Sequence, residues 1–347
     1  MALCIGPVVL EHPVLSAPIA GFTDRIFRDI VREFGGAGLI YTEMVSASGW
    51  VQGRMPPERL SGVEGEARPL GVQLWDREEY PLEEAARRLV DLGVTVIDLN
   101  FGCPKKRIMG THGAGATLLR DPSTVGRLVA AATRGAGRVP VTAKIRLGPS
   151  LASRTAVAVA RSAEAYGAAA VTVHGRTADD GYSVPCNRAL IAEVVQALRI
   201  PVIANGDVHD DASAVATVRE TGAAGVMVAR GALTRPWVFR EIAAALRGDA
   251  VPPTPARAEQ RALLLRHHAA MVEREGDHWG TVLMRKFAVR YLTGMSGARV
   301  FRDRITRVEC GADFRATVEQ FFPVVEDADR QPRLDSEEWR EPCAARG

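Results

Sequence analysis

Short apolar runs alternate with amphipathic segments from Val14 to Arg230. The runs are nearly continuously apolar, as strands buried on both faces are, and they occupy Val14–Pro18, Leu39–Val45, Pro69–Leu74, Val96–Gly102, Val141–Arg146, Ala170–Gly175, Pro201–Gly206 and Gly225–Arg230. Helical periodicity between them is clearest in Glu78–Leu92, Ser123–Arg134, Ser153–Tyr166, Arg188–Leu198 and Asp210–Thr221. Eight strands alternating with helices predict an α/β protein with a closed (β/α)8 TIM barrel.

A doubly wound sheet is the competing fold. That fold usually has fewer strands, and it carries a glycine fingerprint directly after the first strand. Because no such fingerprint follows Pro18, the pattern favours the barrel.

The segment Val251–Pro255 is a compositional break that predicts a linker. We expect residues 1–250 to form the catalytic barrel and residues 256–325 to form a small all-helical domain. The helices of that domain are expected at Ala256–Glu275, Thr281–Leu292, Arg299–Arg307 and Asp313–Phe322. Residues 326–347 are expected to form a flexible tail, because seven acidic and three basic residues lie between Glu326 and Glu341.

Composition narrows the class of protein. A hydrophobic content of 47% and a charged content of 24% are typical of a soluble globular chain. The net charge of +3 is too small to indicate a nucleic-acid partner by itself. Five scattered cysteines form neither a disulfide framework nor a zinc pattern, so we expect a cytoplasmic protein without a metal. No signal peptide is expected, and no run approaches the roughly 20 apolar residues that span a membrane.

Polar residues gather where the predicted strands end. In a β/α barrel, functional residues lie at the carboxyl ends of the strands. The ends of six strands carry Gln73, Asn100, Lys144, His174, Asn205 and Arg230. Burying one such side chain unpaired is costly, so six of them at one face of the barrel predict a site for a ligand.

The strings DLNFGCP, TAKIR, HGRT, IANGD and VARGALTRPWVF lie at these strand ends. They resemble the corresponding strings of the bacterial tRNA-dihydrouridine synthases, and the resemblance extends from about Val14 to Arg307. These enzymes hold FMN and use NADPH to reduce the C5=C6 bond of uridines in tRNA. The resemblance therefore implies a TIM-barrel oxidoreductase with FMN, NADPH and tRNA as its cofactor, reductant and partner. We also expect a monomer.

The resemblance assigns the catalytic role to Cys103. A thiol with an ordinary pKa of about 8.5 is mostly protonated near neutral pH, so it is a suitable proton donor to C5 of the uracil ring. The alternative is that Cys103 is simply a small buried hydrophobic residue. The other unusual cysteine of the barrel, Cys186, is not expected to be catalytic.

The resemblance also implies a set of residues that bind the cofactor. Lys144 and His174 are expected at the flavin edge, and the alternatives are a lysine that extends to water and a core histidine. The Asp207 carboxylate has the wrong sign for a phosphate, so we expect a structural role or a contact through its backbone. The full set is Pro18, Ile19, Ala20, Gln73, Lys144, His174, Asn205, Gly206, Asp207, Ala229 and Arg230; the last five would form a phosphate cradle after the seventh and eighth strands.

The residues expected to contact the tRNA or its uracil are Asn100, Lys105, Lys106, Arg107, Arg176, Arg285 and Lys286. The amide of Asn100 can recognise a ring edge, and the basic side chains can neutralise phosphates. The segment from Arg285 to Arg307 holds seven basic residues and one acidic residue. Such a run can also be an ordinary solvated helix face, and the family resemblance favours RNA.

Three other functions compete with this one. A flavin barrel that acts on a free pyrimidine, similar to dihydroorotate dehydrogenase, would not need a basic helical domain. A non-catalytic RNA-binding barrel would not need Cys103, Lys144 and His174 together. A barrel isomerase without a cofactor would not bind FMN.

Overall fold

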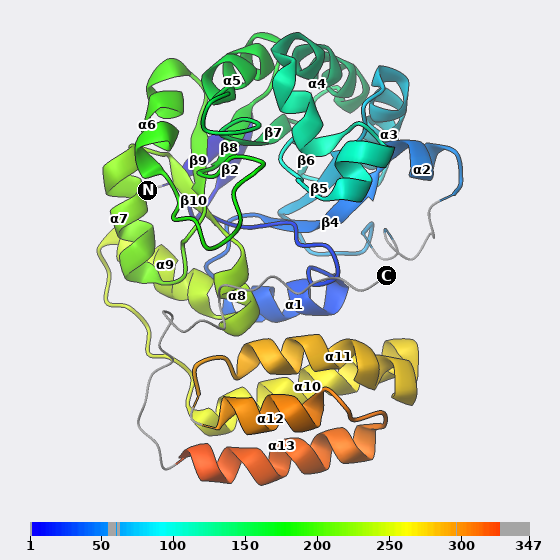
Figure 1. Cartoon of the computed structure of the whole chain (residues 1–347), viewed down its shortest axis with the longest axis vertical. Helices are drawn as coiled ribbons and strands as arrows, with labels where there is room; N and C mark the ends of the chain where they lie inside the picture. Colours follow the sequence, from blue (N-terminus) through cyan, green and yellow to red (C-terminus); the bar gives the residue numbers. More distant parts are fainter. Residues whose placement is uncertain (1, 55–59, 61–62, 296, 327–347) are drawn as a thin grey trace.

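The eight predicted strands form one parallel sheet in the computed structural model, which describes residues 2–54, 60, 63–295 and 297–326 (Figure 1). The strands are β3 (Val14–Ser16), β4 (Ile40–Ser46), β5 (Leu70–Trp75), β6 (Val96–Asn100), β7 (Val141–Arg146), β8 (Ala170–His174), β9 (Val202–Asn205) and β10 (Gly225–Val228). The sheet order runs from β4 through β10 to β3, and a parallel bridge between Leu15 and Leu39 closes it. The predicted (β/α)8 barrel is therefore confirmed.

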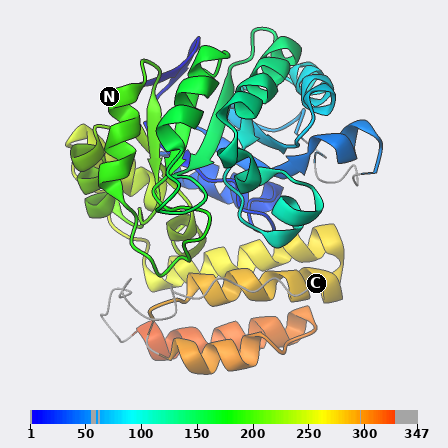
Figure 2. The same cartoon turned by 45° about the horizontal axis from the view of Figure 1, so that its top comes forward.

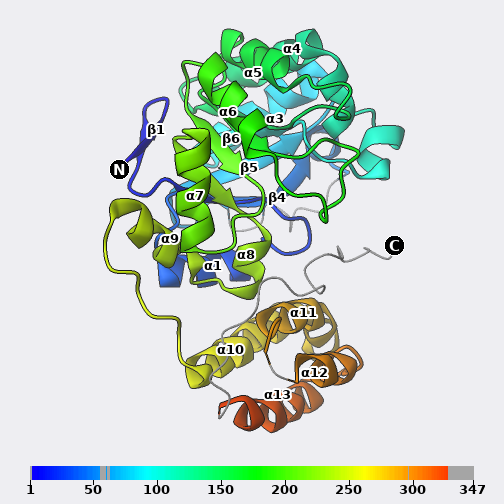
Figure 3. The same cartoon turned by 60° about the vertical axis from the view of Figure 1, so that its left-hand side comes forward.

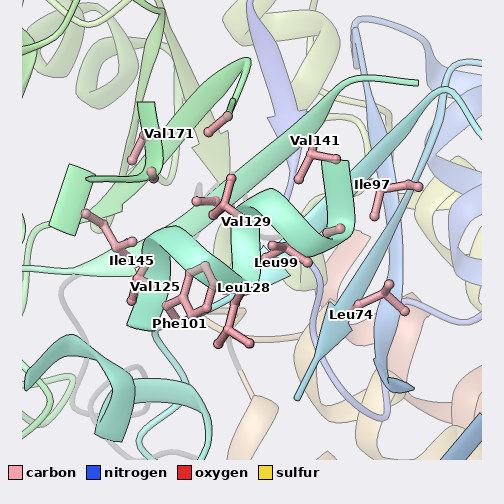
Figure 4. Packing of buried hydrophobic residues seen from close by; sticks show 14 of the residues in the cluster. Leu74, Ile97, Leu99, Phe101, Val125, Leu128, Val129, Val141, Ile145 and Val171 are labelled. Carbon is pink, nitrogen blue, oxygen red and sulfur yellow. The ribbon is translucent and has the colours of Figure 1, made fainter. Parts of the chain in front are cut away.

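Helices surround this barrel (Figure 2). They are α1 (Arg25–Phe34), α2 (Ala47–Val51), α3 (Glu79–Asp91), α4 (Pro122–Ala136), α5 (Ala156–Ala165), α6 (Arg188–Ala197), α7 (Asp211–Thr221), α8 (Arg230–Thr234) and α9 (Val238–Arg247). Helix α4 shows how the sequence produces this layer. Asp121 caps its first turn by accepting hydrogen bonds from the backbone N–H groups of Ser123 and Thr124. Its apolar face, which includes Leu128, packs on the strands that carry Ile97 and Ile145 (Figure 4).

The N-terminal residues form a hairpin that the sequence pattern did not predict. Strands β1 (Leu3–Ile5) and β2 (Val8–Leu10) pair in antiparallel fashion. The buried side chains of Leu3, Ile5 and Leu10 join an apolar cluster with residues of the barrel strands such as Val96 and Met227. The hairpin therefore contributes to the apolar core beside the strands.

Four further helices follow the barrel: α10 (Arg257–Glu275), α11 (Asp277–Tyr291), α12 (Ala298–Ile305) and α13 (Gly311–Glu326). They lie together beside α1 and α8 (Figures 1 and 3). Phe287 of α11 contacts the rings of Phe22 and Phe27 from the barrel, and Arg274 of α10 forms an ion pair of 3.1 Å with Asp24. One apolar cluster is thus shared by the barrel and the four helices.

The proposed division into residues 1–250 and 256–325 stays a prediction, because the shared cluster runs across it. The predicted tail lies outside the described residues except for Glu326, which ends α13. Within the described part of the chain, no helix combines the length and the apolar character that would let it cross a membrane.

Candidate active site

The strand register brings the predicted site residues together at one end of the barrel. Asn100 of β6 pairs with Lys144 of β7, and His174 of β8 pairs with Asn205 of β9. Lys144 Nζ donates a 3.0 Å hydrogen bond to Asn205 Oδ1, so the side chains of β7 and β9 meet across the mouth. These four residues all lie at the carboxyl ends of their strands, where barrel sites are found.

The loop after β6 holds Cys103 by its backbone. Asn100 Oδ1 accepts hydrogen bonds from the N–H groups of Gly102 (3.1 Å) and Cys103 (2.9 Å). Arg146 Nε donates to the carbonyl of Gly102 at 2.9 Å. Gly115 approaches so closely, with φ of +60°, that an added Cβ would lie 2.6 Å from the Cys103 carbonyl oxygen. The backbone that carries the thiol therefore has a fixed position.

The half-buried Cys103 thiol stays protonated at neutral pH. Burial raises its pKa above the ordinary value, although the cations Lys105, Arg146 and Lys144 act in the opposite direction. A protonated thiol can donate a proton to carbon, as the proposed role requires.

A buried carboxylate that sequence reasoning missed lies beneath this loop. Asp98 of β6 is fully buried and accepts hydrogen bonds of 2.6 Å from Gln73 Nε2 and from the Thr142 hydroxyl. Gln73 Oε1 then accepts from Asn100 Nδ2 at 2.8 Å. The chain from Asp98 through Gln73 to Asn100 thus ends on the backbone of Cys103.

These contacts revise the expected roles of Gln73 and Asn100. Both side chains are buried, and each uses its carbonyl oxygen within the chain of hydrogen bonds. They were predicted to recognise ring edges, but their first role in the structure is to orient the loop of Cys103. A contact through their remaining N–H groups stays a prediction.

Lys144 is a buried cation with spare donors. Burial lowers its pKa to about 8, and the nearby Asp98 carboxylate opposes part of that decrease. An ammonium has three N–H donors, and one acceptor, Asn205 Oδ1, is found for them among the described residues. A buried cation of this kind fits an anionic or carbonyl-rich ligand, because such a ligand would offset the cost of burial.

Asp207, near the start of the loop after β9, binds two arginines. Its carboxylate accepts from Arg176 Nη2 at 2.7 and 2.8 Å and from Arg230 Nη2 at 3.1 Å. The residue has φ of +51°, which is unusual for a side chain larger than hydrogen. Arg230 also lies 4.6 Å above the ring of Tyr182. The expectation of a structural role for the Asp207 side chain agrees with these contacts.

Arg176 is buried, and its predicted role in substrate binding stays a prediction. Its side chain is only 2% exposed, and its guanidinium donates to the carbonyls of Val184 (2.5 Å) and Tyr182 (3.1 Å) as well as to Asp207. The guanidinium is therefore committed to the loop after β8, so Arg176 supports the site from within.

His174 lies at the centre of this cationic environment. Burial lowers its pKa well below the usual value, and the charges of Arg146, Lys144, Arg176 and Arg230 act in the same direction. The ring is therefore neutral at physiological pH.

The remaining predicted residues lie in the loops that follow their strands. Pro18 and Ile19 are half-buried, and Ala20 is exposed, in the loop after β3. Gly206 and Ala229 follow β9 and β10, at the same end of the barrel. The sequence pattern predicted that Arg230 ends the eighth strand, but in the structure this residue begins α8.

The two predicted basic groups differ in exposure. Lys105, Lys106 and Arg107 are exposed directly after Cys103. In contrast, Arg285 Nε donates to the Val308 carbonyl at 2.7 Å, and Lys286 Nζ lies over the rings of Phe22 and Phe287 at 5.2 and 5.4 Å. Both side chains are half-buried and contact neighbouring residues, so they are less accessible than residues 105–107, and their assignment to the RNA surface stays a prediction.

Sequence reasoning missed several residues of the site. Asp98 lies two positions before Asn100, and Arg146 lies two positions after Lys144. Because alternate residues of a strand share a face, the two-residue period of a strand could have indicated both. Tyr182, whose ring lies 4.6 Å from the Arg230 guanidinium, was not among the predicted residues. Arg290 of α11 belongs to the basic segment that the sequence shows, but no local pattern could have indicated that it lies near Arg230, whose pKa is lowered mainly by burial and in part by the charge of Arg290.

Known proteins similar to this chain agree with the barrel and its site. The family model for dihydrouridine synthase (Dus) matches residues 15–326. The tRNA-dihydrouridine synthase B of Pseudomonas aeruginosa is 38% identical over 319 residues, which cover 92% of this chain and 95% of that protein. A probable tRNA-dihydrouridine synthase of Rickettsia prowazekii is 34% identical and covers 94% and 99% of the two chains.

Solved structures with the same fold include morphinone reductase in complex with tetrahydroNAD. It has a TM-score of 0.52 at 14% identity, and the alignment covers 73% of this chain and 91% of that one. A 2-naphthoyl-CoA reductase has a TM-score of 0.56 at 11% identity and covers 72% and 52%. At these identities, the likeness concerns the fold alone.

The barrel, the family match and the protonated thiol beside a buried cation together define an oxidoreductase of the β/α barrel class. The relatives fix the assignment more closely. The chain belongs to the dihydrouridine synthase family.

Proposed function

We propose that this protein reduces the C5=C6 bond of a uridine in tRNA to give 5,6-dihydrouridine, with FMN as its cofactor and NADPH as its reductant. The observation that carries the proposal is the protonated thiol of Cys103, on a backbone held by hydrogen bonds, in a barrel whose chain belongs to the dihydrouridine synthase family. The substrate class rests on the relatives, which are named for tRNA.

The residues present fit a flavin phosphate. Lys144, Arg146, Arg176 and Arg230 surround His174, whereas the neighbouring carboxylates are Asp98 and Asp207. The excess of cations suits an anionic ligand. Lys144 and His174 would hold the ring edge, Pro18, Ile19 and Ala20 would line one side, and the backbone of residues 205–207 and 229–230 would bind the phosphate.

The reaction needs a hydride at C6 and a proton at C5 of the uracil. A bound, reduced flavin supplies the hydride. Cys103 donates its Sγ proton to C5, so the C=C bond gains both hydrogens and the thiolate is left to recover a proton from water. Lys105 and Arg146, whose charges favour the thiolate, stabilise that product of proton transfer. Arg146 and Asn100 keep the loop of Cys103 in place during the step.

The RNA must deliver its uracil into the barrel, and removing a base from its stack costs a few kcal/mol. Contacts with phosphates can offset this cost. Lys105, Lys106 and Arg107 are exposed beside Cys103, and Arg304 and Arg307 are exposed on and after α12. These cations support a tRNA partner that spans the barrel and the helices.

The test separates the two half-reactions. The purified protein is expected to bind FMN one-to-one, and Cys103→Ala is expected to leave the reduction of FMN by NADPH intact. The same variant should lower uridine reduction in tRNA by a factor of about 10² to 10⁴, as loss of a positioned acid does. Cys186→Ala is the control, and its activity should match the parent. Failure to bind FMN, or equal activity on free uracil and tRNA, would contradict the proposal.

A further inference from the structure

Arg176 contacts a ring nitrogen of His174. The distance from Arg176 Nη1 to His174 Nε2 is 3.2 Å, and both side chains are buried. The guanidinium cannot turn away, because its other N–H groups are held by Val184, Tyr182 and Asp207. Asp207 is itself fixed by the backbone N–H of Cys186 at 2.8 Å. The orientation of Arg176 toward the imidazole is therefore set by the loop after β8.

This contact determines which nitrogen of His174 carries the proton. A guanidinium has five N–H donors and no acceptor, so Nε2 must accept and must lack a proton. We propose that Arg176 is a positioning residue that holds His174 as the neutral tautomer with its proton on Nδ1. The ring then presents a permanent Nδ1–H donor at the mouth of the barrel.

The other edge of the ring supports this arrangement. A Cβ added to Gly206 would lie 3.0 Å from His174 Cδ2, so this carbon edge packs against the strand end of β9. Nδ1 lies on the opposite edge of the imidazole, and none of the described residues forms a hydrogen bond with it. It is thus available to a ligand.

The surrounding charges prevent His174 from becoming an imidazolium. Four cations lie near the ring: Lys144 and Arg146 of β7, Arg176 of the loop after β8, and Arg230 of α8. The Asp207 carboxylate is engaged by both arginines. Protonation of Nε2 would also place two donors against each other. His174 therefore cannot act as the general acid, and this task is left to Cys103.

A permanent N–H donor selects a ligand with a hydrogen-bond acceptor, such as a ring carbonyl oxygen or an anionic ring nitrogen. The isoalloxazine of the flavin offers both kinds of acceptor, so this part of the inference rests on the proposed function. The donor would stabilise negative charge on the ring in the reduced state.

Nuclear magnetic resonance of the flavin-free, full-length protein tests the tautomer directly. The chain has seven histidines, and the signals of His174 are identified by their loss in His174→Asn. We expect the unprotonated shift at Nε2 and the protonated shift at Nδ1, unchanged between about pH 5 and pH 8. A protonated Nε2, or titration in this range, overturns the inference.

Two substitutions test the donor, because the amide of asparagine can replace Nδ1–H and the amide of glutamine extends to the position of Nε2. His174→Asn should keep FMN affinity within about threefold, whereas His174→Gln should lose roughly tenfold, the effect of one lost hydrogen bond. Equal affinities of the two variants would contradict the donor role.

Arg176→Lys tests the positioning role. Lysine keeps the positive charge but loses the fork that contacts the loop and the ring together, so the His174 signals should move toward a mixture of tautomers. If Arg176→Lys keeps the parent's shifts, Arg176 is not the positioning residue. A parent protein that binds no FMN would contradict the proposed function, while the resonance measurement on the flavin-free protein still decides the tautomer.

Discussion

Asp98 combines two roles within the barrel. It fixes the amide chain that ends on the Cys103 backbone, and its charge raises the otherwise depressed pKa of Lys144. A buried carboxylate is stable only when it is paired in this way. Asp98 is thus the residue through which the thiol and the buried cation are connected.

Asp98→Asn is predicted to weaken FMN binding more at pH 8 than at pH 7. The pKa of Lys144 is about 8 with Asp98 present, and removal of the carboxylate lowers it further, so Lys144 loses its proton at a lower pH. The loss of affinity should approach about tenfold for each unit of pKa shift as the pH rises above the pKa values of both the parent and the variant. Fluorescence titration of FMN at both pH values measures this effect.

The exposed Asp91→Asn is the matched control for this charge removal. Its FMN affinity should follow the parent at both pH values. A parallel loss for Asp98→Asn at pH 7 and pH 8 would mean that its effect is only structural.

The sequence predicted the residues of the site that stand directly at strand ends. Cys103, Lys144 and His174 carry distinctive side chains in distinctive strings, and the structure brings them to one face. The sequence did not predict the neighbouring residues that set the protonation states of these three side chains. Whether Arg176 contacts His174 or a substrate depends on the path of the loop through Tyr182 and Val184, which no local pattern encodes.

At the scale of elements, two histidines connect the helices of the C-terminal unit. His267 of α10 shares a 2.8 Å hydrogen bond with the Tyr291 hydroxyl, and His268 shares one of 2.9 Å with the Thr281 hydroxyl of α11. His268 also stacks on Phe314 of α13, with 4.0 Å between ring centroids. Burial lowers the pKa of both histidines to about 4.

The helical unit is therefore predicted to lose stability on acidification. Both groups bind protons more readily in the unfolded chain, where the histidine pKa is about 6.5. Stability is full above that value, and it falls as the pH drops from about 6.5 toward 4, because protons then favour the unfolded state. Thermal unfolding at pH 7 and pH 5 should show a larger decrease in Tm for the parent than for His268→Phe.

The exposed His278 provides the comparison, since His278→Gln should keep the parent's dependence on pH. If His268→Phe destabilises the protein equally at both pH values, the titration of this residue makes no contribution to stability.

The sequence predicted the type of nearly every long element but not all of the short ones. Helices such as α4 have a clear apolar stripe, and α7 ends at Gly222 in the left-handed conformation that glycine favours. Helix α1 was not among the clearest predicted helices, although its buried Phe27, Ile30 and Val31 follow helical spacing. The ion pair of its buried Arg28 with Glu66, far along the chain, is a tertiary contact that local periodicity cannot predict.

At the scale of the whole molecule, exposed cations occur on both the barrel and the helices. We predict that Lys105→Ala with Lys106→Ala, and separately Arg304→Ala with Arg307→Ala, will weaken tRNA binding. Each lost phosphate contact lowers the number of counterions that tRNA releases when it binds. Each double variant should therefore flatten the slope of log affinity against log salt by about one to two units. Binding measured at three salt concentrations tests the prediction, and FMN reduction should not change.

Arg138→Ala with Arg199→Ala is the control of equal charge. Both residues are exposed and directly precede strands β7 and β9, so they lie at the opposite end of the barrel. An equal loss of salt dependence in this variant would show that only the total charge matters. The sequence placed the RNA surface on residues 105–107 and on Arg285 and Lys286, but a charge count does not reveal how far each of these side chains is exposed.

The seam of the barrel joins distant parts of the chain. Val14 of β3 pairs with Val226 of β10, and the ring of Phe27 of α1 stacks on that of Phe287 of α11. On the ribosome, the first barrel strand leaves the exit tunnel long before its neighbour is translated, and an unpaired strand edge is a site of aggregation. Maturation in the cell therefore depends on the final third of the message. A transcript truncated before Tyr291 would yield an incompletely folded polypeptide, which chaperones bind and proteases degrade.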